Sequence, residues 1–171
     1  MFKIIGAIMI CTGSAAIGIT AANKLGIRIR ILNEWLSIFD LMHAEIKFLL
    51  TPVDELMGKC QINSKKEIKR FFDECINAFN FKENLVFIDT WKDTLNSAEY
   101  LELTYAEKQI LVDLGNVLGR YDANEQATRI EHLRKAMEAR AKAAESEKMR
   151  LGKLYSSLGV ACGIALVIVF I

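Results

Sequence analysis

The stretch EKMRLGKLYSSLGVACGIALVIVFI, residues 147–171, changes from charged to uncharged part-way along. Its last charge is Lys153, and no charged side chain follows in the 18 residues 154–171. A second uncharged run, IIGAIMICTGSAAIGITAA, covers the 19 residues 4–22. As helices, these runs would be roughly 27 to 29 Å long, about the thickness of the hydrocarbon core of a bilayer. The sequence therefore predicts one transmembrane helix at 4–22 and another at 154–171.

The first uncharged run is open to other interpretations. A lysine followed by an apolar run and small residues is also typical of a cleavable signal peptide. A lipobox at Cys11 fits less well, because Ile10 stands where a small residue is needed. A core helix of a soluble protein normally has one polar face, and neither run has one. We favour two spans and leave open whether the first is retained or cleaved.

The positive charges that flank the two runs predict their orientation. Only Lys3 precedes the first run, whereas the region between the runs begins and ends with six cations: Lys24, Arg28, Arg30, Lys148, Arg150 and Lys153. The positive-inside rule therefore places the region 24–153 in the cytoplasm and both termini outside. These six side chains are predicted membrane-surface residues, each attracted to anionic lipid headgroups by about 1 kcal/mol.

The composition of the central region favours helices and argues against nucleic-acid binding. The chain has one proline, Pro52, and lacks long alternating runs of β-branched residues, so strand signals are weak. Its formal net charge is only +1, and no stripe of basic and aromatic side chains is present. Nucleic acid is therefore not an expected partner.

Apolar spacing and helix-start signals divide the first half of this region into three helices. The first continues from the amino-terminal span to about residue 50. A second starts at TPVDEL, residues 51–56, with Thr51 as its cap and Pro52 at its first position. A third starts at SKKE, residues 64–67, where Ser64 and Glu67 are predicted to form a capping box.

The second half predicts three more helices. The fourth lies around residues 85–95, and the fifth covers 103–118 and is ended by Gly119. Asp122 and Glu125 cap the sixth, which runs into the second span. Six amphipathic helices must bury their apolar faces against one another. The expected fold is all-α, about a six-helix antiparallel bundle flanked by transmembrane helices that continue its first and last helices.

Alternating helix directions also predict where the loops lie. If the first helix leaves the membrane and the last returns to it, an even number of helices is needed, and six satisfies this. The loops at 50–52, 64 and 119–122 are then expected at the end of the bundle away from the membrane.

The sequence shows little sign of catalytic chemistry. His43 and His132 are lone histidines without a metal-ligand partner at useful spacing, and the four cysteines form no CxxC motif. DLGNVLGR contains two glycines but lacks the lysine and hydroxyl residue of a phosphate-binding loop. No catalytic residue, cofactor or metal site is predicted, and the protein is not expected to be an enzyme.

Three short motifs carry a resemblance to a known family. GKLYSSLG near the second span, TPVDEL after the first long helix and LGRYDANEQ before the last one resemble the stage III sporulation protein AB family. The matching residues are Thr51, Pro52, Leu118, Gly119, Asp122, Gln126, Lys153, Leu154, Tyr155, Leu158 and Gly159. This chain departs from the family pattern where members often have a leucine after the proline and a serine before the aspartate.

The resemblance implies a function that the residues alone do not indicate. The family belongs to the mother-cell machinery that builds a channel to the forespore, and its members look like the cytoplasmic domains of type II secretion and type IV pilus platform proteins. It implies a non-enzymatic platform in the mother-cell membrane. The implied partners are the stage III sporulation AA-type ATPase and other membrane components of the AA to AH set.

Two alternatives to a platform remain. The first is a membrane-anchored helical sensor, whose spans pass an external signal to the bundle; against it, only residues 1–3 and the extreme carboxy terminus would emerge outside. The second is an enzyme acting on lipid, which would need a polar site that the sequence does not reveal.

Overall fold

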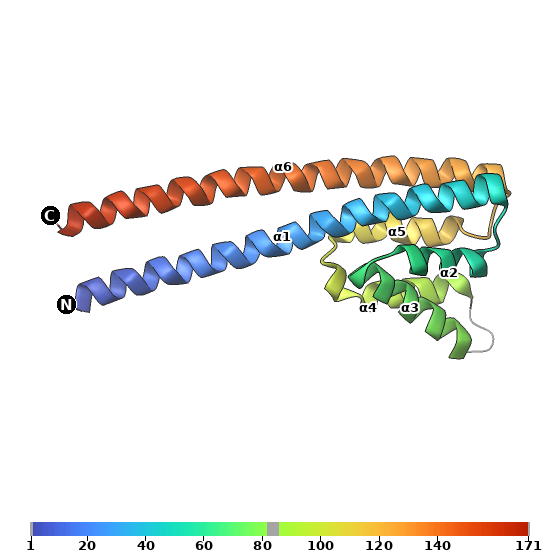
Figure 1. The fold of residues 1–171 in the computed structure, drawn as a ribbon, viewed down its shortest axis with the longest axis horizontal. Coiled ribbons are helices and arrows are strands. Elements are labelled where there is room, and N and C mark those ends of the chain that lie inside the picture. Colours follow the sequence, from blue (N-terminus) through green and yellow to red (C-terminus); the bar gives the residue numbers. More distant parts are fainter. Residues whose placement is uncertain (1, 82–85, 171) are drawn as a thin grey trace. The chain divides into compact units, whose positions relative to one another are not determined.

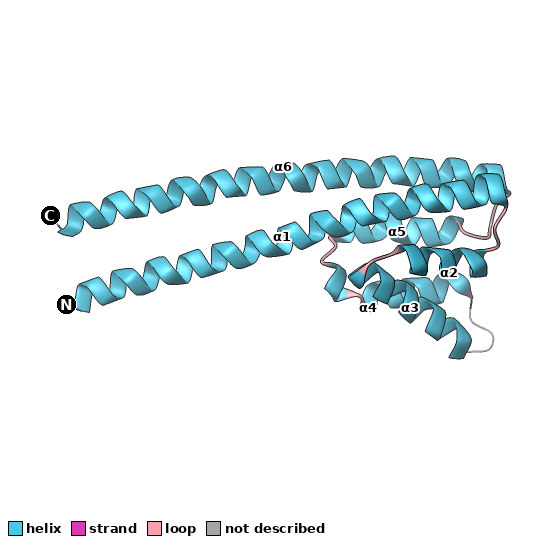
Figure 2. Cartoon of the chain, viewed as in Figure 1, coloured by secondary structure: helices cyan, strands magenta, loops and turns pink. Residues whose placement is uncertain are grey.

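The computed structural model describes the backbone of residues 2–81 and 86–170 and the side chains of residues 24–79 and 86–151. The described backbone forms six α-helices and one short 3₁₀ helix and contains no strand (Figures 1 and 2). The elements are α1 (Phe2–Leu49), α2 (Val53–Asn63), α3 (Lys66–Phe81), α4 (Phe87–Ser97), η1 (Glu99–Leu101), α5 (Tyr105–Val117) and α6 (Ala123–Phe170). The predicted all-α class is confirmed.

The chain divides into two compact units, and α1 and α6 contribute residues to both. One unit contains residues 28–142, and the other contains residues 1–27 and 143–171. Where side chains are described, at 24–79 and 86–151, no helix is both long and apolar enough to cross a membrane. The predicted spans at 4–22 and 154–171 lie outside those residues, so they stay predictions.

Residues 28–142 form a helical bundle. Successive helices run in alternating directions (Figure 1), and α2 packs on α3, α3 on α4 and α4 on α5. Arg134 of α6 also forms an ion pair with Asp40 of α1. The antiparallel arrangement expected for the central region is therefore present in this unit.

The centre of the bundle is an aromatic cluster contributed by three helices. Trp35 of α1, Phe71 and Phe72 of α3, and Trp91 of α4 are fully buried. Their ring centroids lie 4.9 to 6.3 Å apart, and several pairs meet edge to face, the geometry that aromatic quadrupoles favour. The indole N–H of Trp91 also donates a hydrogen bond to the Leu111 carbonyl at 2.8 Å, which joins α4 to α5.

The start of α2 differs from the prediction. Thr51 does not cap the helix, because its hydroxyl donates instead to a carboxylate oxygen of Glu45 at 2.6 Å. Pro52 is the N-cap rather than the first helical residue, and its carbonyl accepts from the Leu56 N–H at 2.9 Å. The hydrogen bonds from Lys59 and Thr51 hold the pKa of Glu45 below its usual value. Thr51 therefore helps to fix the chain as it leaves α1.

The capping box predicted at Ser64 and Glu67 is wrong. The Ser64 hydroxyl donates to the Cys60 carbonyl at 2.7 Å and so closes the end of α2. The carbonyl of Lys65 accepts the first hydrogen bond of α3. The Glu67 carboxylate binds the guanidinium of Arg30 in α1.

The loop at Ser64 also lies at a different place from the one expected. The N–H of Lys65 donates to the Glu34 carboxylate in α1. Glu34 is 15 residues before Leu49, which is about 22 Å along a helix. Because α2 runs antiparallel to α1 (Figure 1), its 11 residues carry the chain back along α1, away from the loop at 50–52. The Ser64 loop is therefore not beside the loop at 50–52.

The other two loops expected at that end do come together. Gly119 ends α5 with a left-handed φ of +74°, as predicted, and a Cβ added there would lie 3.4 Å from Cγ2 of Val53. Asp122 caps α6 as predicted, since its carboxylate accepts from the N–H groups of Asn124 and Glu125 at 3.0 Å each. We call this part of residues 28–142 the loop end.

Candidate interaction surfaces

The family-motif residues of the α5–α6 connection shape the loop end. Leu118 is buried, and the Gln126 side chain clamps the turn, donating to the Tyr121 carbonyl at 2.6 Å and accepting from the Gly119 N–H at 3.4 Å. Glu125, predicted to cap α6 with Asp122, instead forms an ion pair with Arg129 at 2.7 Å. These contacts give Leu118, Gly119, Asp122 and Gln126 structural roles.

A polar cleft opens beside this connection. Its volume is about 380 Å³, and it is lined by Asp113, Asn116, Val117, Arg120, Tyr121, Arg129, His132 and Leu133. The Arg129 guanidinium lies 4.1 Å from the centroid of the Tyr121 ring, a cation–π contact. The hydrogen bond to Glu125 raises the pKa of Arg129, so this side chain is always cationic. The described lining of the cleft thus combines two arginines and a histidine with one carboxylate, and Arg129 is already paired with Glu125.

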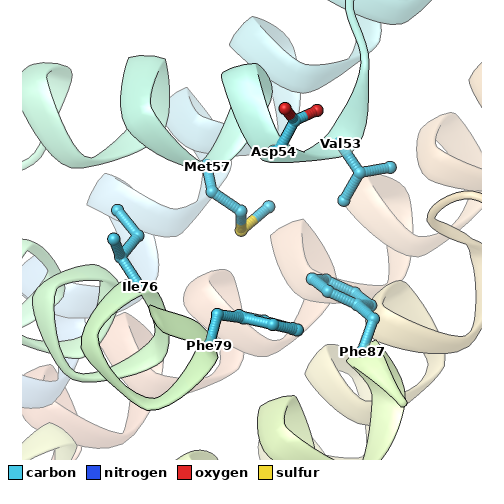
Figure 3. A pocket seen from close by; sticks show the side chains of 6 residues that line it. All are labelled: Val53, Asp54, Met57, Ile76, Phe79 and Phe87. Carbon is cyan, nitrogen blue, oxygen red and sulfur yellow. The ribbon is translucent and has the colours of Figure 1, made fainter. Parts of the chain in front are cut away.

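A second cavity, the apolar pocket, lies between α2, α3 and α4 (Figure 3). Its volume is about 320 Å³, and it is lined by Val53, Asp54, Met57, Ile76, Phe79 and Phe87. The rings of Phe79 and Phe87 are stacked, with centroids 5.4 Å apart and planes 15° from parallel. Among the described residues of this lining, Asp54 alone is charged, and it is exposed.

The end of α1 exposes three consecutive apolar side chains, which we call the apolar tip. Phe48, Leu49 and Leu50 are 71%, 64% and 69% exposed. Leu50 has a φ of +52°, a left-handed conformation that branched side chains rarely adopt. The apolar tip therefore places large hydrophobic groups in solvent at a strained position.

Arg28 and Arg30, which were predicted to be membrane-surface cations, form ion pairs that the sequence did not indicate. Arg28 binds the carboxylate of Glu107 in α5, with a shortest distance of 2.6 Å. Arg30 binds Glu67 at 2.8 Å. Glu107 is fully buried and also accepts from the Thr104 N–H at 2.8 Å, which completes a capping box at the start of α5. The pattern Thr104 to Glu107 signals this box in the sequence, but nothing local indicates Arg28.

The remaining predicted membrane-surface and motif residues belong to the ends of the chain. Lys24, Lys148 and Arg150 are exposed. Lys148 lies close to α1, because its Nζ would be 3.6 Å from a Cβ added at Gly26. The side chains of Lys153, Leu154, Tyr155, Leu158 and Gly159 lie outside the described residues.

Titratable groups of the described chain do not gather into a metal site. Among residues 24–79 and 86–151, no group of three His, Cys, Asp or Glu side chains could hold a metal ion. Cys60 and Cys75 are buried, and burial raises the pKa of each thiol to about 12. Both thiols are therefore protonated at neutral pH, which makes them poor nucleophiles.

Fold and surfaces together define an all-α helical-bundle domain with a polar cleft, an apolar pocket and an exposed apolar tip. The family model described as stage III sporulation protein AB matches residues 3–171, and the chain belongs to this family. The family expected from the sequence motifs is thus confirmed.

A solved structure shares the fold. It is titled "Stage III sporulation protein AB (SpoIIIAB)" and is 18% identical, with a TM-score of 0.64. The match covers 72% of this chain and 98% of that chain. A comparison with curated proteins finds no match.

Proposed function

We propose that this protein is a non-enzymatic, membrane-anchored platform that helps to assemble the channel between mother cell and forespore. Membership of the stage III sporulation protein AB family supports a role in sporulation. The observation that carries the platform role is the meeting of the two motif loops, at Val53 and Gly119, beside a polar cleft. An assembly protein needs a surface of this kind to bind its partners. The proposal assigns no chemical step to this surface.

The partner proposed for the polar cleft is the stage III sporulation AA-type ATPase. Arg120 and Arg129 line the cleft together with His132, while Asp113 is the only carboxylate among its described lining residues. Because Arg129 is already paired with Glu125, a loop carrying carboxylates would complement Arg120, and arginine binds carboxylates in a planar, bidentate manner. The ATPase would therefore present an acidic segment to the α5–α6 connection.

The membrane attachment is also part of the proposal. Predicted spans at 4–22 and 154–171 would anchor the chain twice in the mother-cell membrane, with the region between them in the cytoplasm. Exposed Lys24, Lys148 and Arg150 would then lie near anionic headgroups. Other membrane components of the AA to AH set would contact the protein from within the bilayer. Cysteine labelling between residues 59 and 69 tests the orientation, because labelling from outside the cell would contradict it.

Co-purification from sporulating cells tests the ATPase contact. We expect the ATPase to co-purify with the wild-type chain in mild detergent and to be lost with Arg120→Glu, which reverses an exposed charge in the cleft. Arg140→Glu is the matched control, since Arg140 is exposed on α6 and does not line the cleft. Capture of the membrane partners without any ATPase, or equal capture by both variants, would count against the proposal.

A further inference from the structure

Within the described chain, the side chains of the apolar tip are mostly exposed to solvent. Phe48, Leu49 and Leu50 expose 71%, 64% and 69% of their surface, whereas single, scattered hydrophobic residues are the norm on soluble surfaces. Leu50 also holds a φ of +52°, which glycine or asparagine would adopt with less steric conflict. A leucine here is therefore explained by a contact that covers it.

The apolar pocket is a cavity of matching character. About 320 Å³ of space lies between Val53, Met57, Ile76, Phe79 and Phe87, a volume within the range of sites that hold small ligands. Its lining contains no residue of the apolar tip. The tip of the same chain therefore does not fill its own pocket.

The apolar tip and the apolar pocket lie close together along the chain. Leu50 is three residues before Val53, so their Cα atoms are at most about 11 Å apart. A knob beside a complementary hole is what a two-fold contact between identical chains requires, because each copy then contributes both. The charges agree with such a contact. Lys47, whose Nζ lies 5.5 Å from the Phe48 ring centroid, adjoins the tip, and Asp54 lines the pocket.

We propose that two copies of this protein associate through this surface. The apolar tip of each copy enters the apolar pocket of the other, and Lys47 of each copy lies opposite Asp54 of the other. This association goes beyond the platform role and leaves the polar cleft, which other residues line, open to another partner.

A substitution at Leu50 separates association from folding. Energy transfer between donor-labelled and acceptor-labelled copies of the full chain, measured in mild detergent over a dilution series, reports the dissociation constant. We expect Leu50→Asn to raise this constant at least tenfold, because two leucine contacts are lost per pair. The thermal midpoint of the diluted variant should not fall, since asparagine tolerates the left-handed conformation.

Charge reversal supplies an independent test. Lys47→Asp places two carboxylates opposite each other in a pair of identical copies, and Asp54→Lys places two lysines there. Each variant alone should associate more weakly than wild type. Mixing one with the other restores both opposite-charge contacts, so we expect the mixed pair to bind about tenfold more tightly than either variant with itself.

Three outcomes would overturn the proposal. The first is an absence of energy transfer at every concentration of the wild-type chain, which would assign the surface to a different protein. The second is an unchanged dissociation constant in Leu50→Asn. The third is a mixture of the two charge variants that binds no more tightly than each alone. None of these results bears on the ATPase contact, which is tested at Arg120.

Discussion

Glu107 shows how a single buried charge can depend on one partner. Its side chain is fully buried, and its oxygens accept hydrogen bonds from the Arg28 guanidinium and from the Thr104 N–H. Removing one member of a buried ion pair leaves the other charge uncompensated, at a cost of about 3 to 5 kcal/mol. Because Arg28 is itself 18% exposed, we expect Arg28→Ala to lower the free energy of unfolding by about 3 kcal/mol in urea denaturation.

Arg30 provides the matched control for this prediction. It also pairs with a glutamate on another helix, but its side chain is 43% exposed and that of Glu67 is 25% exposed. Solvent-exposed pairs contribute only about 0 to 1 kcal/mol, so Arg30→Ala should change the unfolding free energy by less than about 1 kcal/mol. Equal losses in the two variants would show that the burial of Glu107 has no special effect.

The burial of Cys60 and Cys75 determines how the reactivity of their thiols should depend on pH. Burial raises the pKa of both thiols to about 12. Because both thiols are buried in the protonated form, their contribution to the free energy of unfolding is complete below about pH 8.5, the pKa of a thiol in the unfolded chain. This contribution is lost as the pH rises toward 12. In a variant with Cys11 and Cys162 replaced by serine, we expect maleimide labelling to stay slow up to pH 9. Labelling of both thiols should become rapid in urea, and fast labelling of the folded chain would contradict their burial.

At the scale of elements, α5 lies against α4 at a glycine. A Cβ added to Gly115 would be 2.5 Å from Cδ1 of Trp91. That indole cannot move aside easily, because it is fully buried and donates to the Leu111 carbonyl. We expect Gly115→Ala to lower the unfolding free energy by about 3 kcal/mol, as overpacked cores do, measured by thermal or urea denaturation.

Gly58 of α2 is the control for that substitution. Nothing lies within 4 Å of a Cβ added there, and alanine is favoured over glycine inside a helix by about 0.5 to 1 kcal/mol. Gly58→Ala should therefore stabilise the protein slightly. We expect the change in unfolding free energy to have opposite signs in the two variants. An unchanged unfolding free energy in Gly115→Ala would mean that α4 and α5 do not pack as described.

Helices could be predicted from the sequence because apolar spacing and end signals are local properties. The predicted fifth helix, 103–118, agrees with α5 (Tyr105–Val117) to within two residues at each end. Side-chain partners were harder. Thr51 and Ser64 were expected to start helices, but a hydroxyl can equally bind a nearby carboxylate or close the preceding helix, as these two do. The local sequence does not indicate which of these acceptors a hydroxyl group will bind.

Long-range contacts account for what the sequence did not reveal about the surfaces. Arg28 and Glu107 are 79 residues apart, and α2, α3 and α4 each contribute to the apolar pocket. Such juxtapositions follow from the packing of whole helices. The motif loops are an intermediate case. Alternating helix directions predicted that 50–52 and 119–122 would meet, but the same alternation carries the loop at Ser64 back along α1 to Glu34.

For the whole molecule, the decisive property is the proposed double attachment to the membrane. The carboxy-terminal span can be tested alone in a chain that lacks residues 1–22. Leu166 lies inside the uncharged run 154–171, 12 residues after its start. An arginine costs about 2.5 to 3.5 kcal/mol on insertion scales at the centre of a span and less toward its ends. We therefore expect Leu166→Arg to release the truncated chain into the supernatant on alkaline extraction.

Leu166→Val is the control, because it keeps the span apolar and should stay in the membrane pellet. The result separates a membrane span from other sources of membrane attachment. If protein partners held the chain at the membrane, alkaline treatment would release both variants equally. If residues 154–171 cross the bilayer, only the arginine variant is lost. Arginine and valine variants that resist extraction to the same degree would refute the carboxy-terminal span and, with it, the two-pass arrangement.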